Sequence, residues 1–313
     1  MSDPNYVCRQ SEVLEVMVLP VQIVLGKTGE ALVNRVSNAI GIVFEPHRMR
    51  REARAKIDVA EAETKAEIIR AEGRLKISEI EARGLQRMIY EEGRNQENIE
   101  SITAKAIPHL SKDAKPEDLE EDFVRYLFDK AKLVSNEDMQ EMWAKILAGE
   151  ANAAGSFSRR SIDLVSQLSK ADAELFTKFV RSVWIIGKPV PIITNADEVD
   201  RNDETRFSFS ELQHLESIGL ITFSGTGTYT RTGIGKTGRA FYYGCPVDLE
   251  FSSDGPNSIL VGMALLTATG VEIASLSGAE SSIPAFEKGL QHLLSQNIAV
   301  SIPIEAKQAY LAL

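Results

Sequence analysis

Two Gly-Lys-Thr triplets are the residues of this chain that come nearest to nucleotide chemistry. Gly235-Lys236-Thr237 and Gly26-Lys27-Thr28 both match the end of a phosphate-binding loop, in which backbone N–H groups and a lysine surround the phosphates. That loop also needs a glycine six residues before the lysine. The chain has Thr230 and Val21 at those positions, so we expect neither triplet to bind a nucleotide.

Other catalytic and metal-binding patterns are missing from the sequence. No Gly-x-Ser-x-Gly turn presents a nucleophile, and Cys8 and Cys245 are the only cysteines. The histidines stand alone, without metal-ligand spacing: His47, His109, His214 and His292. We therefore expect no catalytic residue, no cofactor and no metal, in a protein that is not an enzyme. A site assembled from residues distant in the sequence stays an open alternative.

A pair of arginines is the one candidate for anion binding. Arg159 and Arg160 follow Ser156 and Ser158, and together they suggest a helix start at which a phosphate is held by N–H groups and cations. The alternative is that the serine only caps the helix and the arginines are its solvated charges.

Any functional residues would have to be positioned by a long charged helix, which we expect over residues 48–107. Glutamate precedes a cation by four residues at Glu52–Lys56, Glu61–Lys65, Glu72–Lys76 and Glu79–Arg83, a spacing that stabilises helices. A continuous helix of this length would be roughly 90 Å long. Such a rod cannot be buried within one small domain, so we expect it to be a coiled-coil-like stalk that self-associates.

The apolar residues of this stalk define the expected oligomer interface. Steps of eleven residues, from Ile57 to Ile68 and from Ile69 to Ile80, indicate a straight or right-handed pairing and not a heptad zipper. The expected interface residues are Ile57, Ile68, Ile69, Leu75, Ile80 and Leu85. A single solvated helix held by charge pairs is the alternative.

The segment before the stalk, residues 1–47, is predicted to be an apolar stretch followed by an amphipathic helix. Leu32, Val36 and Ala39 recur at helical spacing. The apolar run 13–25 is shorter than the roughly 20 residues of a spanning helix. We expect a cytoplasmic protein, with a peripheral membrane contact through residues 13–44 as an alternative.

After the stalk we predict a helical domain at 108–183 and an α+β domain at 184–313, giving a mainly α member of the α+β class. Residues 108–115 are interpreted as a linker. The run Phe209–Leu220 reads as a helix, a glycine cap and a strand, which indicates a winged-helix-like arrangement. Its polar residues are mostly acidic and the net charge is −10, so nucleic acid is not an expected partner.

Three runs of residues carry a resemblance to known proteins: Gln96–Ile102, Glu137–Glu150 with its Trp-Ala-Lys-Ile-Leu-Ala-Gly-Glu signature, and Gly155–Ser161. They resemble an uncharacterised bacterial domain-of-unknown-function family, and they are similar to the abortive-infection alpha family. The resemblance is strongest over residues 30–180. It implies a role in phage defence and assigns no activity.

These observations favour a non-enzymatic assembly or sensor protein that acts through protein–protein contacts. We expect a homo-oligomer with a further protein partner that the sequence does not identify. A nucleic-acid-binding regulator that uses the C-terminal domain and a peripheral membrane-surface protein are the alternatives.

Overall fold

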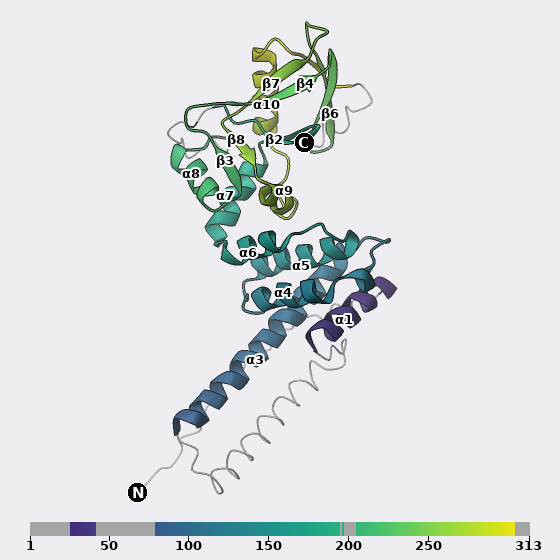
Figure 1. Ribbon diagram of the computed structural model, residues 1–313, viewed down its shortest axis with the longest axis vertical. Helices are drawn as coiled ribbons and strands as arrows, with labels where there is room; N and C mark the ends of the chain where they lie inside the picture. Colours follow the sequence, from purple (N-terminus) through teal and green to yellow (C-terminus); the bar gives the residue numbers. More distant parts are fainter. Residues whose placement is uncertain (1–25, 42–78, 195, 197–204, 304–313) are drawn as a thin grey trace, which may run out of the picture.

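The computed structural model describes residues 26–41, 79–194, 196 and 205–303 (Figure 1). The apolar run 13–25 and most of the predicted stalk, residues 48–78, lie outside the described residues. The helices are α1 (Lys27–Ile40), α3 (Glu79–Ala106), η1 (Ile107–His109), η2 (Pro116–Asp118), α4 (Glu121–Ala131), α5 (Glu137–Asn152), α6 (Arg159–Gln167), α7 (Lys170–Val180), α8 (Phe209–Ser217), α9 (Ala268–Ala274) and α10 (Ile283–Ser295).

The strands all lie between residues 183 and 301 of the described chain, so the fold is a mainly helical α+β structure, as the sequence predicts. They are β1 (Val183–Ile186), β2 (Lys188–Pro191), β3 (Ile221–Phe223), β4 (Tyr229–Ile234), β5 (Thr237–Tyr242), β6 (Cys245–Glu250), β7 (Asn257–Gly262), β8 (Ala264–Leu266) and β9 (Ala299–Ser301). They form an antiparallel sheet of order β2-β1-β5-β6-β9 and two antiparallel pairs, β3-β8 and β4-β7.

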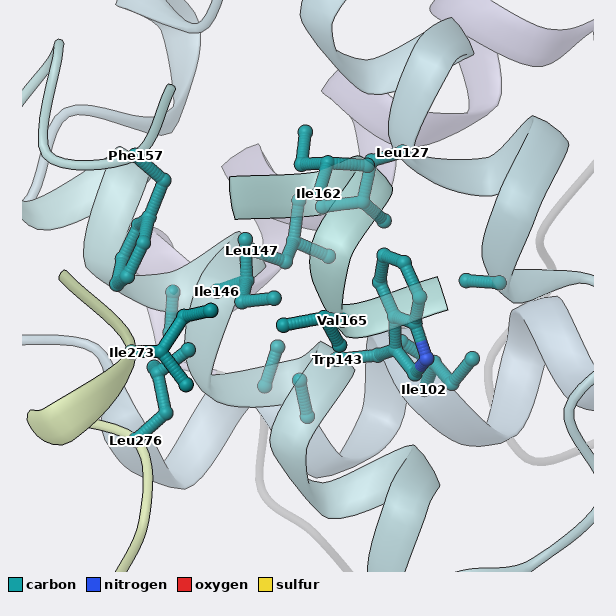
Figure 2. Packing of buried hydrophobic residues seen from close by; sticks show 14 of the residues in the cluster. Ile102, Leu127, Trp143, Ile146, Leu147, Phe157, Ile162, Val165, Ile273 and Leu276 are labelled. Carbon is teal, nitrogen blue, oxygen red and sulfur yellow. The ribbon is translucent and has the colours of Figure 1, made fainter. Parts of the chain in front are cut away.

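A helical body forms around α5, which the C-terminal half of α3 crosses and which α4 and α6 accompany (Figure 1). Trp143 of α5 is fully buried against Ile102 of α3 and Val165 of α6 (Figure 2). Ile273 and Leu276, from α9 and the residues after it, enter the same cluster. The hydrophobic core of the body therefore includes residues from the C-terminal part of the chain.

Helix α1 binds the body through the apolar face that the sequence predicts. Leu32, Val36 and Ala39 are buried, and Arg35 on the same helix donates to the carbonyl oxygen of Leu119 at 2.7 Å. Arg125 of α4 donates in return to the carbonyl oxygen of Ala39 at 2.7 Å. These two long-range bonds satisfy backbone acceptors at the ends of short elements, which fixes the position of α1.

A second core lies beneath the five-stranded sheet, where α10 covers one face. Trp184 of β1 stacks on Phe286 of α10 with ring centroids 5.3 Å apart. Gly289 allows this packing, because a Cβ at that position would lie 2.6 Å from the Trp184 ring. Tyr242 of β5 completes the aromatic group and donates to the carbonyl oxygen of Arg181 at 2.9 Å.

The helix, glycine and strand predicted from the run Phe209–Leu220 are present as α8, Gly219 and β3. Helix α8 begins after Ser208, whose side chain caps it, and it ends before Gly219, which has a left-handed φ of 84°. Strand β3 then pairs with β8, and the chain between them, residues 224–263, contains four other strands.

Three local features complete the fold. Helix α5 is capped by Asn136, whose side chain accepts from the Met139 N–H at 3.0 Å. The predicted linker 108–115 overlaps a 3-10 turn, and its Leu110 packs against the core of the body. Strand β4 pairs with β7 and not with the next strand along the chain, β5, which pairs with β6.

Candidate functional site

The N-terminal half of α3, residues 79–94, is the described part of the predicted stalk, and it extends away from the helical body (Figure 1). Its helical conformation is supported by ion pairs between neighbouring turns, Glu79–Arg83 at 3.7 Å and Arg87–Glu91 at 3.6 Å. All four side chains are mostly exposed, so each pair contributes little to stability.

Large apolar side chains of this segment are exposed to solvent. Ile80 is 72% exposed, Met88 60% and Tyr90 66%, while Leu85 is half-buried. Exposed residues of this size gathered on one projecting helix are typical of an interaction surface.

The other expected interface residues, Ile57, Ile68, Ile69 and Leu75, lie outside the described residues. Of the six, the structure therefore places Ile80 and Leu85 on the projecting helix and says nothing of the rest.

The C-terminal half of α3 is fixed to the body by a polar network as well as by its apolar face. Asn98 donates to the carbonyl oxygen of Lys132 at 2.8 Å and accepts from Gln140 at 3.1 Å. Gln140 also accepts from the Ser101 hydroxyl at 2.8 Å. Arg94 donates to the hydroxyl of Ser135, in the loop before α5, at 3.0 Å. A buried network satisfied in this way holds the helix in one register against α5.

The Trp-Ala-Lys-Ile-Leu-Ala-Gly-Glu signature occupies α5, and its residues have structural roles. Gly149 makes room for the ring of Phe157, because a Cβ there would lie 2.5 Å from that ring. The carboxylate of Glu150 accepts from the N–H groups of Gly155 at 2.6 Å and Phe157 at 3.0 Å. The signature therefore shapes the turn that leads from α5 into α6.

The predicted anion site lies at the end of that turn, and one of the protein's own carboxylates occupies it. Glu272 of α9 accepts from the Ser158 N–H at 2.8 Å and from the Ser161 hydroxyl at 2.5 Å. Ser158 also caps α6, as the sequence predicts. A carboxylate at this position is favoured by the unpaired N–H groups and the positive end of the helix.

The two arginines after this cap are exposed and bind no carboxylate of the described residues at the helix start. Arg159 lies 5.4 Å from the centre of the Tyr126 ring, and Arg160 is exposed. The Tyr126 hydroxyl donates to Asp163, and this hydrogen bond, with burial, raises the pKa of the tyrosine. Arg159 thus contacts a neighbouring helix, and an external anion at this end of α6 would compete with Glu272.

The helix predicted to resemble a recognition helix, α8, uses its polar residues within the fold. Glu211 forms a reciprocal capping box with Ser208, and it lies 3.7 Å from Lys178. His214 bonds Asp172 at 2.5 Å. Burial raises the pKa of Asp172, but the hydrogen bonds from His214 and Ser169 outweigh it and leave that pKa below its ordinary value.

A shallow hollow lies over strands β5, β6 and β9. Its charged residues Arg239 and Asp248 bond each other at 2.6 Å, and this contact lowers the pKa of Asp248. Across the described ranges, no three His, Cys, Asp or Glu side chains are placed to share a metal ion. Within the same ranges no helix combines the length and apolarity needed to cross a membrane.

The roles of Glu150 and Glu272 are the main features that sequence reasoning missed. A glutamate that ends an apolar helix face gives a weak signal for Glu150. No local signal marks Glu272, because its partner Ser161 is 111 residues away along the chain.

Comparison with curated proteins and with solved structures finds no match for this chain. A family model does match, over residues 82–286. The match begins within α3 and ends within α10, so it extends further toward the C-terminus than the resemblance seen in the sequence, and it starts later. Since it spans more than half of the chain, the chain belongs to the family described as "Protein of unknown function (DUF2806)".

Proposed function

We propose that this protein is a non-enzymatic assembly or sensor protein that acts through protein–protein contacts, and that it is a homo-oligomer. The observation that carries the proposal is the projection of α3 residues 79–94 from the body with Ile80 and Met88 exposed (Figure 1). Among the described residues, this helix is fixed to the body at one end and exposed at the other, where it can present its free face to a partner.

The energetics favour covering that face. Burying an isoleucine or methionine side chain stabilises a complex by about 1.5–3 kcal/mol. In a symmetric dimer every contact is made twice, so a small apolar face has a doubled effect. The ion pairs Glu79–Arg83 and Arg87–Glu91 support the helical conformation of this segment.

Because α3 is fixed to the body at its C-terminal half, we propose that it transmits the effect of a bound partner from its projecting half to the body. Its C-terminal half is held by Asn98 and Gln140, and the carboxylate of Glu272 connects that body to α9. A partner bound to the projecting half would act on a helix that is continuous with the core. This connection favours a sensor or an assembly unit over a passive spacer.

Phage defence is a narrower proposal within this function. It rests only on the similarity of the Glu137–Glu150 and Gly155–Ser161 runs to the abortive-infection alpha family. A phage challenge of cells with and without the gene tests it. Equal plating efficiency across a broad phage panel would remove the narrower proposal and leave the assembly function in place.

The assembly function is tested by light scattering on the full chain and on two matched variants. Ile80 is 72% exposed on the projecting helix, and Leu133 is 73% exposed at the end of α4. We expect a wild-type oligomer that Ile80→Asp dissociates and Leu133→Asp leaves intact. A wild-type monomer at micromolar concentration, or an oligomer equally insensitive to both changes, would contradict the proposal.

A further inference from the structure

We propose that α4 and η2 form a helix-binding surface of which α1 is a displaceable occupant, so that the same amphipathic helix also binds there from another molecule. Helix α1 lies against both elements (Figure 1). When α1 leaves, it uncovers an apolar surface of the body. This surface is separate from the projecting half of α3, and the inference does not rest on the self-association proposed for that half.

One face of α1 makes the apolar part of the contact. Leu32, Val36 and Ala39 are at most 1% exposed, and they share a hydrophobic cluster with Leu119 and Phe123. Their spacing of four and then three residues places them on one side of a helix. Amphipathic helices bind partner proteins through side chains at these positions. Helix α1 therefore contacts the body in the manner of a bound helical ligand.

Two arginines give the contact a direction and a register. Both Nε and Nη2 of Arg35 donate to the carbonyl oxygen of Leu119, at the end of η2, with Nε at 2.7 Å. Arg125 of α4 donates to the carbonyl oxygen of Ala39 at 2.7 Å, and its guanidinium forms an ion pair with Glu121 at 2.9 Å. A cation near the C-terminal end of a helix is favoured by the helix dipole. The surface therefore recognises both an arginine and the C-terminal end of the bound helix.

The chain also shows why α1 is separable from the body. The family match begins at residue 82, so it contains α4 and η2 but not α1. Residues 42–78 stand between α1 and α3, so no short connection forces α1 onto this surface. Helix α1 has 14 residues and no side-chain hydrogen bond at its N-cap, and a helix this short is marginal in water on its own. Its helical structure therefore depends on the contact.

Amide hydrogen exchange of the wild-type chain tests the release of α1. After correction for intrinsic rates, we expect the amides of residues 32–39 to exchange at least about tenfold faster than those of α5 around Trp143. The reason is that α1 leaves the surface while the body stays folded. Equal protection of α1 and α5 would show that α1 is released only by global unfolding, and it would overturn the inference.

Binding from another molecule is tested with a fluorescein-labelled peptide of residues 26–41. Val36 is buried in the contact, whereas Asn34 is exposed on the same helix. The full-length Val36→Asp variant should release its own α1, because the contact would bury an unpaired charge. We expect it to bind the peptide at least about tenfold more tightly than wild type does in fluorescence anisotropy. Full-length Asn34→Asp adds the same charge outside the contact and should bind the peptide as weakly as wild type.

The two arginines test the specificity of this binding. A peptide with Arg35→Ala should bind the Val36→Asp chain about tenfold more weakly, because the Leu119 carbonyl loses its donor. Adding Arg125→Ala to the Val36→Asp chain should weaken binding of the unchanged peptide in the same way. If neither change affected the dissociation constant, the peptide would be adhering to apolar surface without the proposed register, which contradicts the inference.

The remaining outcomes concern the fold of the Val36→Asp chain. We expect it to keep the cooperative thermal transition of the body in circular dichroism. Loss of that transition would show that α1 is a permanent part of the core, and a folded variant that does not bind the peptide would exclude binding from another molecule. Either result overturns the inference. Neither depends on the molar mass of the wild-type chain, so this inference and the proposed assembly function can fail separately.

Discussion

The two halves of α3 share one helix and one pattern of apolar spacing, yet they lie in different surroundings. Ile102 is completely buried between α3 and α5, whereas Ile80 is 72% exposed on the projecting half. The periodicity of the sequence determines which side of the helix is apolar, and it does not determine what covers that side. The body covers it for one half, and for the other we propose a second copy of the chain.

The largest expected effect comes from truncating the same residue type in each half. Ile102→Ala should lower the free energy of unfolding by about 2–5 kcal/mol, because it removes a fully buried side chain and leaves a cavity. Ile80→Ala should change it by less than about 0.5 kcal/mol at concentrations where the chain is monomeric. Urea denaturation measures both, and equal losses would mean that the chain itself buries Ile80.

A second comparison is between the effects on stability of replacing Gly149 in the body and Gly93 on the projecting half of α3. Gly149→Ala should cost about 1–3 kcal/mol of stability, since the new methyl group overlaps the Phe157 ring. Gly93→Ala, on the projecting half, should stabilise the helix by roughly 0.5–1 kcal/mol, because its Cβ would meet no atom of the described residues within 4 Å. Thermal melts of the two variants should therefore shift in opposite directions. A destabilised Gly93→Ala would show a close neighbour at that position.

The third comparison is between Glu272, whose carboxylate joins α9 to α6, and Glu91, whose carboxylate lies on the projecting half of α3. Glu272→Ala should lower stability by about 1–2 kcal/mol, because the Ser158 N–H and the Ser161 hydroxyl lose a charged acceptor. Amide hydrogen exchange at the first turn of α6 should also be faster in the Glu272→Ala variant than in wild type. Glu91→Ala should change neither quantity, and unchanged exchange in Glu272→Ala would exclude the capping role.

The smallest expected effect is the pH-dependent contribution of Asp172 to the free energy of unfolding. Because its folded-state pKa is lowered, Asp172 contributes stability above its ordinary value of 3.8, and the contribution is lost as the pH falls through the lowered pKa. Asp172→Asn should cost roughly 0.5–1 kcal/mol at neutral pH, and the difference from wild type should disappear once the pH has fallen below the lowered pKa. Arg83→Gln on the projecting half should show no comparable pH-dependent loss. A pH-independent difference for Asp172→Asn would contradict the assignment.

Local structure was predictable wherever a short-range rule governs it. The apolar face of α1 was predicted from helical spacing, and a serine cap before Arg159 from residue type, and the structure confirms both. The cap of α5 could not be assigned in this way, because Ser135 and Asn136 are both good capping residues and only the geometry distinguishes them.

Long-range contacts were not predictable from the sequence. The pairing of β4 with β7 and the hydrogen bond of Glu272 to Ser161 join residues whose sequence separation gives no periodic signal. That Ile80 and Leu85 belong to an oligomer interface stays a prediction from helical spacing. Spacing alone did not show that α3 extends beyond the body, with Ile80 and Met88 exposed.

The molar mass of the full chain in solution tests the central claim most directly. Light scattering at micromolar concentration should give at least twice the 34.5 kDa of one chain, and the Ile80→Asp variant should return to the single-chain mass. A wild-type mass of 34.5 kDa across that concentration range would contradict self-association through the projecting half of α3.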